Sequence, residues 1–489
     1  MNLLAESVFE KSGAKYSHRI MIVDKDNLVG RSGLQDVFSS RGFEIVVYRD
    51  DLDYRINHGN DENVSEKSVL LIVNGVPFIP YDVYKDFREY QLTWEELFPR
   101  LHGDTLRQHP EVDIELLYIA TQGNYDDLRT RAGTEQFLQK SVYQKDTVTR
   151  YLEAEDMSLS ESAKKASHYR DWIQIAKRKS ILDVLAVRYK VDRKANEINS
   201  LFKAFLLKEY GKLAGEIDRD TPILVSRAME FMMDASDKFA IIVMDGMSEF
   251  DWRILSEGFK DIKYAEDAVF AMIPTVTSVS RQCLLSGKFP KELENAWSQS
   301  KEKVEFIACA KKLGFQDNQI SYQRGYDADF GGLIRCGAVI LNDVDDMVHG
   351  QKQGREGMAA GITLLSESGQ LVSLTQRLLS AGFDVFISAD HGNVMRTGMG
   401  RYQKAGVETE TRSHCMMVLK DFADKEPIRD QYHLIEFPKY YLPDEYDYLI
   451  CDTGDSFDIK GDVVMTHGGI TIEEVIVPFI MIKADENNG

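Results

Sequence analysis

Three apolar runs in the second half of the chain each break off at a carboxylate. FAIIVMD ends at Asp245, GAVILND leads through Asp343 to Asp345, and FDVFISAD ends at Asp390. From residue 238 onward, short β-rich runs of this kind alternate with helical stretches, which is typical of a mostly parallel sheet with covering helices. Because ligands of such sheets bind beyond the carboxyl ends of the strands, we expect these acids to line one rim of an α/β fold.

A rim of several carboxylates needs positive charge nearby. Unpaired, the acids would repel one another, and each would resist ionisation. Three of the ten histidines lie where such a rim can use them. His391 follows Asp390 directly, and His349 lies four residues after Asp345, a spacing that brings two side chains to one side of a helical turn. His467 lies in a Gly-flanked loop ahead of a capping-box pattern, T-x-x-E.

These side chains together indicate a metal site. Histidine and carboxylate ligands without a thiolate favour Zn²⁺ or Mn²⁺ over a structural cysteine zinc site. The alternative for each residue on its own is an ordinary role: an exposed or satisfied histidine or, for Asp390 and Gly392, a tight turn after a strand. The joint arrangement favours the metal site.

Between the first two acids, the stretch VFAMIPTVTSVSRQCLLSG runs from a strand through Pro274 into a helix that stops at Gly287. Four hydroxyl residues crowd the entrance of this helix, namely Thr275, Thr277, Ser278 and Ser280. One of them is expected to cap the helix. Another is a candidate nucleophile, because free N–H groups at a helix start attract an anion and a divalent metal makes an alkoxide accessible at neutral pH.

In this order, the motifs resemble the alkaline phosphatase superfamily and, within it, PglZ-domain proteins. The residues that carry the resemblance are Asp245-Gly246, the P-T-V-T-S-V-S-R stretch that begins at Pro274 with its L-L-S-G ending, Asp345-x-x-x-His349, Asp390-His391-Gly392 and His467-Gly468-Gly469. The resemblance covers roughly residues 238 to 485, and the preceding region resembles the N-terminal part of such proteins more loosely. It implies a catalytic domain with a central, mostly parallel sheet flanked by helices.

The resemblance also implies two divalent ions, Zn²⁺ or alternatively Mn²⁺, and a threonine nucleophile. Thr277, the fourth residue of the P-T-x-T pattern, would be the attacking group and a metal ligand. One ion would be held by Asp345, His349 and His467, and the other by Asp245, Asp390, His391 and Thr277.

Three further residues are candidates for contact with the phosphate. Ser280 and Arg281 fall where relatives place phosphate-contacting residues, although the residue types differ. Arg412, in TETRSHCMMVL, is a candidate phosphate clamp through its planar guanidinium, with an ordinary surface arginine as the alternative.

The activity that the resemblance implies is metal-dependent phosphohydrolysis, of phosphodiesters such as nucleotides or oligonucleotides ahead of monoesters. Sulfate esters are disfavoured, because superfamily sulfatases use an oxidised Cys or Ser and a threonine cannot give the same aldehyde. Cofactor-independent phosphoglycerate mutases use a serine and an inserted domain that has no counterpart here. The alternative from another class is a non-catalytic, metal-stabilised assembly subunit, because PglZ proteins occur in BREX-type phage defence and in signalling, with protein partners. All seven ligand positions are filled, which favours catalysis.

The composition limits which binding partners and which cellular compartment we expect for this protein. The net charge of −20 makes unaided binding of duplex DNA unexpected, because affinity for the phosphate backbone comes from Lys and Arg. Five scattered cysteines without C-x-x-C suit reduced thiols. The first residues lack the apolar stretch of a secretory signal, and no run approaches the roughly 18 apolar residues of a membrane span. We therefore expect a cytoplasmic protein without a membrane segment.

The length of 489 residues predicts two or three domains. Residues 18–80 contain three strand-like runs and a helical one, and Asp24 after the first run is expected to open a loop. Helical periodicity follows, as in RKSILDVLAVRYKVDRKANEINSLFKAFLLKEYGKLAG. We therefore divide the chain into a small α/β domain at 1–110, a helical region at 111–236 and the catalytic α/β domain at 237–489.

Overall fold

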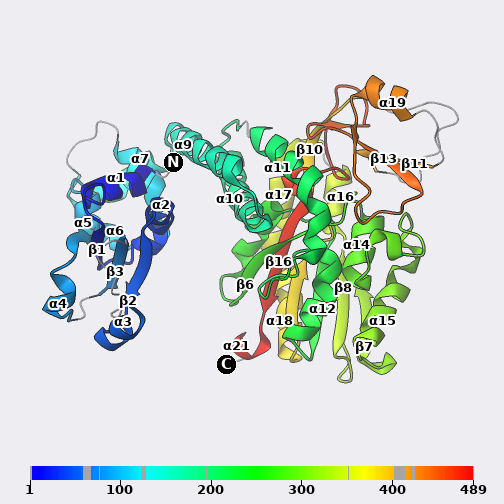
Figure 1. Ribbon diagram of the computed structural model, residues 1–489, viewed down its shortest axis with the longest axis horizontal. Coiled ribbons are helices and arrows are strands. Elements are labelled where there is room, and N and C mark those ends of the chain that lie inside the picture. The colour runs from blue at the N-terminus through cyan, green and yellow to red at the C-terminus, as the bar shows by residue number, and fades with distance from the viewer. Residues whose placement is uncertain are drawn as a thin grey trace. The chain divides into compact units, whose positions relative to one another are not determined.

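The computed structural model of the chain describes residues 3–58, 68–75, 78–122, 128–193, 196–350, 352–400, 413–420 and 425–487. The chain forms two compact units, Met1–Leu159 with Arg188–Arg193, and Ser160–Val187 with Lys194–Gly489. Figure 1 labels the helices and strands of both units. Among the described residues, no helix combines the length and the apolar character needed to cross a membrane.

The first unit contains a four-stranded parallel sheet with the strand order β2-β3-β1-β4. Its strands are β1 Arg19–Asp24, β2 Glu44–Tyr48, β3 Val69–Asn74 and β4 Arg88–Leu92. Its helices are α1 Leu3–Lys11, α2 Leu34–Ser40, α3 Asp51–His58, α4 Tyr81–Tyr84, α5 Trp94–Leu97, α6 Gly103–Arg107, α7 Ile114–Thr121 and α8 Arg131–Phe137. Asp24 accepts the backbone N–H groups of Leu28 and Val29, both at 2.8 Å, and so closes the loop expected after β1.

Long helices follow, as their apolar spacing predicts. They are α9 Lys145–Lys165, α10 Tyr169–Arg188, α11 Asn196–Glu209 and α12 Ala228–Ala235. In the second unit, aromatic residues of α10 and α11 pack on the sheet. Trp172 lies 5.1 Å from Phe202 between ring centroids, and Phe202 lies 6.3 Å from Phe270 at the end of strand β6. Apolar burial therefore joins these helices to the domain that follows them.

The second unit is built on a six-stranded sheet with the order β6-β16-β9-β5-β8-β7. Its strands are β5 Phe239–Met244, β6 Ala265–Phe270, β7 Ile320–Arg324, β8 Cys336–Leu341, β9 Asp384–Ser388 and β16 Ile476–Ile482. Strands β9, β5, β8 and β7 are parallel, whereas β16 runs antiparallel to both of its neighbours. Every residue of β5 and β8 is buried, as expected for parallel strands covered on both faces.

Helices flank this sheet (Figure 1). They are α13 Glu249–Leu255, α14 Thr277–Ser286, α15 Glu302–Lys312, α16 Asp343–Gly350, α17 Gly354–Glu367 and α18 Gln370–Ser380, with the short α21 Ala484–Asn487 following β16. The predicted fold class, a mostly parallel central sheet flanked by helices behind a small α/β unit and a helical region, is confirmed.

Two small sheets stand beyond the carboxyl ends of the parallel strands (Figure 1). One consists of β10 Val394–Gly398, β14 Asp455–Ser456 and β15 Val463–Thr466, and the other of β11 Met416–Lys420, β12 Ile435–Glu436 and β13 Tyr446–Ile450. Helices α19 Lys425–Tyr432 and α20 Ile472–Val475 belong to the same part of the chain. Strand β10 begins three residues after His391 and β15 ends directly before His467, so the first of these sheets adjoins the rim.

Candidate metal centre

The three predicted acids follow three neighbouring parallel strands. Asp245 comes directly after β5, Asp390 lies two residues after β9, and Asp345 lies in the first turn of α16, which follows β8. Since β9, β5 and β8 are adjacent in the sheet, the acids share one rim, as expected. Asp343 is not part of this group, because its carboxylate accepts a hydrogen bond of 3.0 Å from the hydroxyl of Tyr326.

Four residues meet at the buried side of the rim, and we call them the inner cluster: Asp245, Thr277, Asp390 and His391. The side chains of Asp245, Asp390 and His391 offer ligand atoms that lie within 4.8 Å of one another. The hydroxyl of Thr277 donates to Oδ1 of Asp245 at 3.3 Å and lies 3.1 Å from Nε2 of His391. All four residues are buried.

The remaining three predicted ligands form the outer cluster: Asp345, His349 and His467. Nε2 of His349 lies 3.4 Å from Oδ2 of Asp345, and Nε2 of His467 lies 3.5 Å from Oδ1 of the same carboxylate. Asp345 and His467 also share a 4.8 Å neighbourhood with His391, whose ring stacks on that of His467 at a centroid distance of 4.2 Å. His391 therefore lies within reach of both clusters.

The residues of both clusters fit divalent cations. In the two clusters, three buried polar atoms have no hydrogen-bond partner among the described residues: Oδ1 of Asp345, Oδ2 of Asp390 and Nε2 of His467. Leaving such an atom unsatisfied costs roughly 1–3 kcal/mol, which a bound ion would offset. Carboxylate, imidazole and hydroxyl donors without a thiolate suit Zn²⁺ or Mn²⁺.

The pKa shifts of residues in both clusters also favour the binding of cations. Burial, followed by the neighbouring charge of Asp390, raises the pKa of Asp245 well above its usual range. Burial lowers the pKa of His467 to about 3, so that its imidazole is neutral, which is the form that binds a metal. Burial works to raise the pKa of Asp345, but the hydrogen bond with His349 and the charges of the neighbouring histidines together outweigh it and lower that pKa. The same bond raises the pKa of His349.

The hydroxyls at the start of α14 do not cap this helix, so that expectation is wrong. Val276 is the N-cap residue, and no side chain caps the helix. The hydroxyl of Thr275 instead donates to the carbonyl of Gly469 at 3.0 Å and accepts the N–H of Gly468 at 3.1 Å. Thr277 is directed at the inner cluster. Thr275 therefore holds the loop that carries His467, whereas Thr277 belongs to the inner cluster.

The predicted phosphate-contacting residues are engaged within the protein. The hydroxyl of Ser280 donates to the carbonyl of Asp390 and accepts the N–H of Met272 at 2.9 Å. The buried guanidinium of Arg281 contacts Oδ2 of Asp245, and its Nε donates to Glu302 at 2.7 Å. Both residues thus support ligands of the inner cluster, and contact with substrate stays a prediction. Arg412 lies outside the described residues.

Backbone carbonyls orient two of the histidines. Nδ1 of His467 lies 2.9 Å from the carbonyl oxygen of Thr275, and Nδ1 of His391 lies 3.1 Å from that of Gly392. With a proton on each Nδ1, both Nε2 atoms are left as acceptors that face the clusters. Sequence reasoning missed these contacts and the Arg281–Glu302 support, because every residue has a carbonyl and nothing in the residue types marks which one is used.

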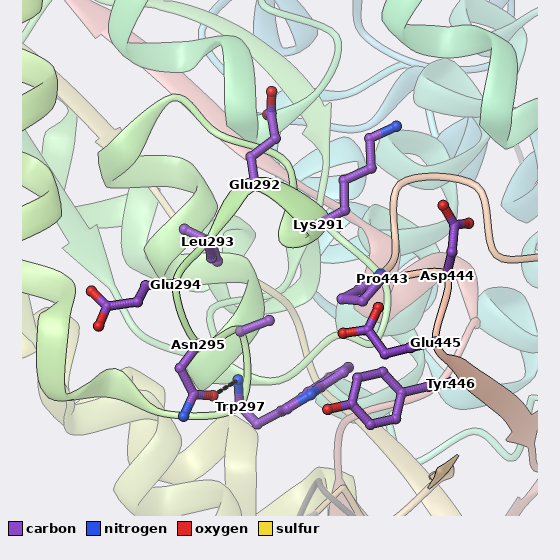
Figure 2. Close-up of a pocket in the computed structure, with 11 residues that line it drawn as sticks. Lys291, Glu292, Leu293, Glu294, Asn295, Trp297, Pro443, Asp444, Glu445 and Tyr446 are labelled. Carbon is purple, nitrogen blue, oxygen red and sulfur yellow. Dashed lines mark hydrogen bonds between the residues drawn. The ribbon is translucent and has the colours of Figure 1, made fainter. Parts of the chain in front are cut away.

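A separate pocket of about 580 Å³ lies between residues 291–297 and 443–446. Figure 2 shows the rings of Trp297 and Tyr446 together on one side of it, with Glu445 above them. The ring centroids are 5.9 Å apart and the ring planes are perpendicular. Its lining carries four carboxylates and a single lysine and includes no residue of either cluster, so it is poorly suited to a phosphate backbone.

Known proteins are similar to the part of the chain that contains the two clusters. Residues 225–482 match the family described as the BREX system PglZ alkaline phosphatase-like domain. A search of curated proteins found no match. Similar solved structures include murine ectonucleotide pyrophosphatase/phosphodiesterase 5, inactive and in complex with AMP, at 14% identity over 50% of this chain and 88% of that chain, with a TM-score of 0.36.

Two further solved structures are similar over half of this chain. The human ectonucleotide pyrophosphatase/phosphodiesterase 5 matches at 14% identity over 50% of this chain and 89% of its own, with a TM-score of 0.36. The phosphonoacetate hydrolase of Sinorhizobium meliloti 1021 in complex with phosphonoformate matches at 11% identity over 50% and 89%, with a TM-score of 0.32. The family match spans more than half of the chain and contains every residue of both clusters, and the chain therefore belongs to the PglZ family of alkaline phosphatase-like domains.

Proposed function

We propose that the protein is a metal-dependent phosphohydrolase that cleaves a phosphodiester, a nucleotide or oligonucleotide, with Thr277 as its nucleophile. The observation that carries this proposal is the position of the Thr277 hydroxyl, 3.3 Å from Asp245 and 3.1 Å from His391 at the first residue of α14. Membership in a family of alkaline phosphatase-like domains supports the phosphoester class.

Two divalent cations, Zn²⁺ or alternatively Mn²⁺, would be held by the two clusters. The inner cluster would hold one with Asp245, Asp390, His391 and Thr277, and the outer cluster the other with Asp345, His349 and His467. When bound, such cations lower the pKa of a coordinated alcohol and neutralise charge on the phosphoryl oxygens and the leaving group.

The chain itself positions the reacting atoms. The free N–H groups in the first turn of α14 favour an anionic phosphoryl group beside Thr277. The Thr277 oxygen forms a bond to phosphorus while the ester oxygen leaves with its electron pair, and the hydroxyl proton passes to Asp245, the carboxylate to which it is hydrogen-bonded. Water then attacks the phosphothreonine, and its bond to phosphorus forms as the Thr277 oxygen leaves. The Thr277 oxygen takes back the proton held by Asp245, and the proton lost by water neutralises the released ester oxygen.

The cellular setting is part of the proposal. The family description names a BREX system, which supports a role in phage defence with protein partners. All five cysteines are buried and free of disulfides, which suits the reducing cytoplasm. The acidic chain is expected to receive a nucleic acid from a partner rather than to bind duplex DNA unaided.

Hydrolysis of chromogenic esters tests the reaction. Purified protein with Zn²⁺ or Mn²⁺ should hydrolyse bis-p-nitrophenyl phosphate faster than p-nitrophenyl phosphate. Thr277→Ala should abolish turnover, and Ser278→Ala, which removes the neighbouring hydroxyl, should retain it. Full activity of Thr277→Ala would remove the nucleophile. Wild-type protein that binds cations and hydrolyses neither ester would favour the non-catalytic assembly subunit.

A further inference from the structure

The two loops that carry His391 and His467 meet at one buried residue. The N–H of Gly392, directly after His391, donates to the backbone carbonyl of Glu474 at 2.9 Å. The side chain of Glu474 accepts the N–H of Gly469, two residues after His467, at 2.8 Å. Glu474 is fully buried, so both contacts are shielded from water.

The same carboxylate holds the start of α20. Its Oε2 accepts the N–H of Thr471 at 3.1 Å and the hydroxyl of Thr471 at 2.6 Å, which completes the capping box. This satisfies donors at the helix start and fixes the end of the His467 loop relative to the carboxylate.

A buried arginine on β10 neutralises Glu474. The guanidinium of Arg396 contacts Oε2 of Glu474, and its Nη1 donates to the carbonyls of Asp452 and Asp455 at 3.0 and 2.9 Å. Arg396 is 1% exposed and Glu474 is 0% exposed. Removing one member of such a pair would leave the other charge buried without its partner.

Two glycines close to the histidines, Gly392 and Gly469, are required by close packing against the backbone before Glu474 and against Arg396. A Cβ atom on Gly469 would lie 2.0 Å from Nη2 of Arg396. A Cβ atom on Gly392 would lie 1.9 Å from the carbonyl oxygen of Glu473. The His467 loop therefore packs directly against the Arg396 side chain, and the His391 loop packs against the backbone that carries Glu474, so a shift of Glu474 would reach both loops.

We propose that Arg396 and Glu474 are positioning residues that set the spacing of His391 and His467 and, through it, the affinity of the centre for its cations. The inference rests on the proposed function in one respect, namely that these histidines bind cations. The pair acts through the two loops, because its hydrogen bonds go to the backbone beside the histidines.

Cation binding to the full chain, stripped with a chelator and titrated with Mn²⁺ in a calorimeter, tests the inference. Glu474→Gln keeps the size of the side chain and removes its charge, and we expect affinity for Mn²⁺ to fall about 10–100-fold. Glu266→Gln is the matched control, because it removes an ion pair with Arg253 in the same unit, on β6 and away from both loops. The affinity of Glu266→Gln for Mn²⁺ should stay within about twofold of that of the wild type, as expected for distant sites.

Gly469→Ala supplies a second variant that changes no charge. Its Cβ must displace the Arg396 guanidinium, so that Mn²⁺ affinity should fall again. Turnover of both variants should recover at saturating Mn²⁺, which a merely structural defect would not allow. If circular dichroism shows that Glu474→Gln does not fold, Gly469→Ala decides the question.

Two outcomes separate this inference from the proposed function. If the wild type binds Mn²⁺ and hydrolyses the diester while the folded variants bind Mn²⁺ equally well, the positioning role alone is wrong. If the wild type binds neither Mn²⁺ nor Zn²⁺, the proposed function fails, and the inference fails with it.

Discussion

The inner and outer clusters differ in how firmly the protein holds their side chains. In the inner cluster, Asp390 and His391 are completely buried, Arg281 contacts Asp245, and the N–H of Gly246 donates to Asp390 at 3.2 Å. In the outer cluster, half of the His349 side chain is exposed, and its hydrogen-bonded neighbour Asp345 lies on the same helical turn.

From this difference we expect the two clusters to hold their ions with different strength. Buried ligands with fixed partners are preorganised, so the inner cluster, which contains the proposed nucleophile, is suited to hold its ion continuously. The outer cluster is open to solvent at His349 and is suited to exchange its ion and to admit the phosphoryl group. The predictions below test this contrast.

Removing the histidine that both clusters share should have the largest effect. His391→Ala should lower turnover by about 10³-fold or more, because residues that act as one unit fail together. His349→Ala should weaken only the outer ion, and elemental analysis after desalting should find one ion where the wild type retains two. Equal losses of metal in the two variants would contradict the contrast.

Metal removal should lower thermal stability. Ions that bind only the folded state stabilise it by about 2.7 kcal/mol when the free ion is 100-fold above its dissociation constant. Differential scanning calorimetry with EDTA, with metal loss checked by elemental analysis, should show a lower melting temperature for the wild type. In His391→Ala the chelator should change little, and an unchanged wild-type melting temperature would count against a preformed centre.

Acid should destabilise the metal-stripped protein through His467. The folded-state pKa of His467 is about 3, below the unfolded value of about 6.5, so the unfolded state binds an extra proton between these values. Stability should therefore fall as pH drops from about 6.5, by at most about 1.4 kcal/mol per unit. Urea unfolding across this range measures the slope, which His467→Asn should flatten.

The pKa of His349 is raised, so its contribution has the opposite sign. It is fully present below the unfolded pKa and is lost as pH rises through the folded pKa. His349→Asn should thus remove stability on the acid side, and the same effect in both variants would refute these assignments.

Loosening the helix of the outer cluster should have the smallest effect. Tyr326→Phe removes the 3.0 Å hydrogen bond to Asp343 at the start of α16, worth about 1 kcal/mol. Affinity for the more weakly bound Mn²⁺ should fall tenfold or less by calorimetry. Tyr322→Phe, which removes a contact to Glu302 beside the inner cluster, is the control and should leave that weaker ion unaffected.

The sequence was sufficient to predict the sheet and the rim. Fully apolar strands are typical of central parallel strands, and parallel strands bring their ends together, which is why Asp245, Asp345 and Asp390 share one edge. Helical spacing correctly paired Asp345 with His349. These inferences rest on local periodicity, which a single sequence contains.

The sequence was insufficient wherever a contact joins distant segments. Arg281 follows the hydroxyl-rich helix entrance and is predicted to contact the phosphate, but its contacts with Asp245 and Glu302 were not predicted. The Arg396–Glu474 pair links two loops across a sequence separation of 78 residues. Neither contact has a periodic signature, because each depends on tertiary packing. The roles of Ser280, Arg281 and Arg412 at a substrate stay predictions, as do the three domain boundaries.

The place of β16 in the sheet affects when the sheet can be completed during synthesis of the protein. Strand β6 leads to Thr277 and joins the main sheet along β16, a strand supplied by residues 476–482. During translation, β6 therefore cannot join that sheet until residues 476–482 have left the ribosome. Thr277, the proposed nucleophile, would therefore reach its position beside Asp245 and His391 only after residues 476–482 have been synthesised.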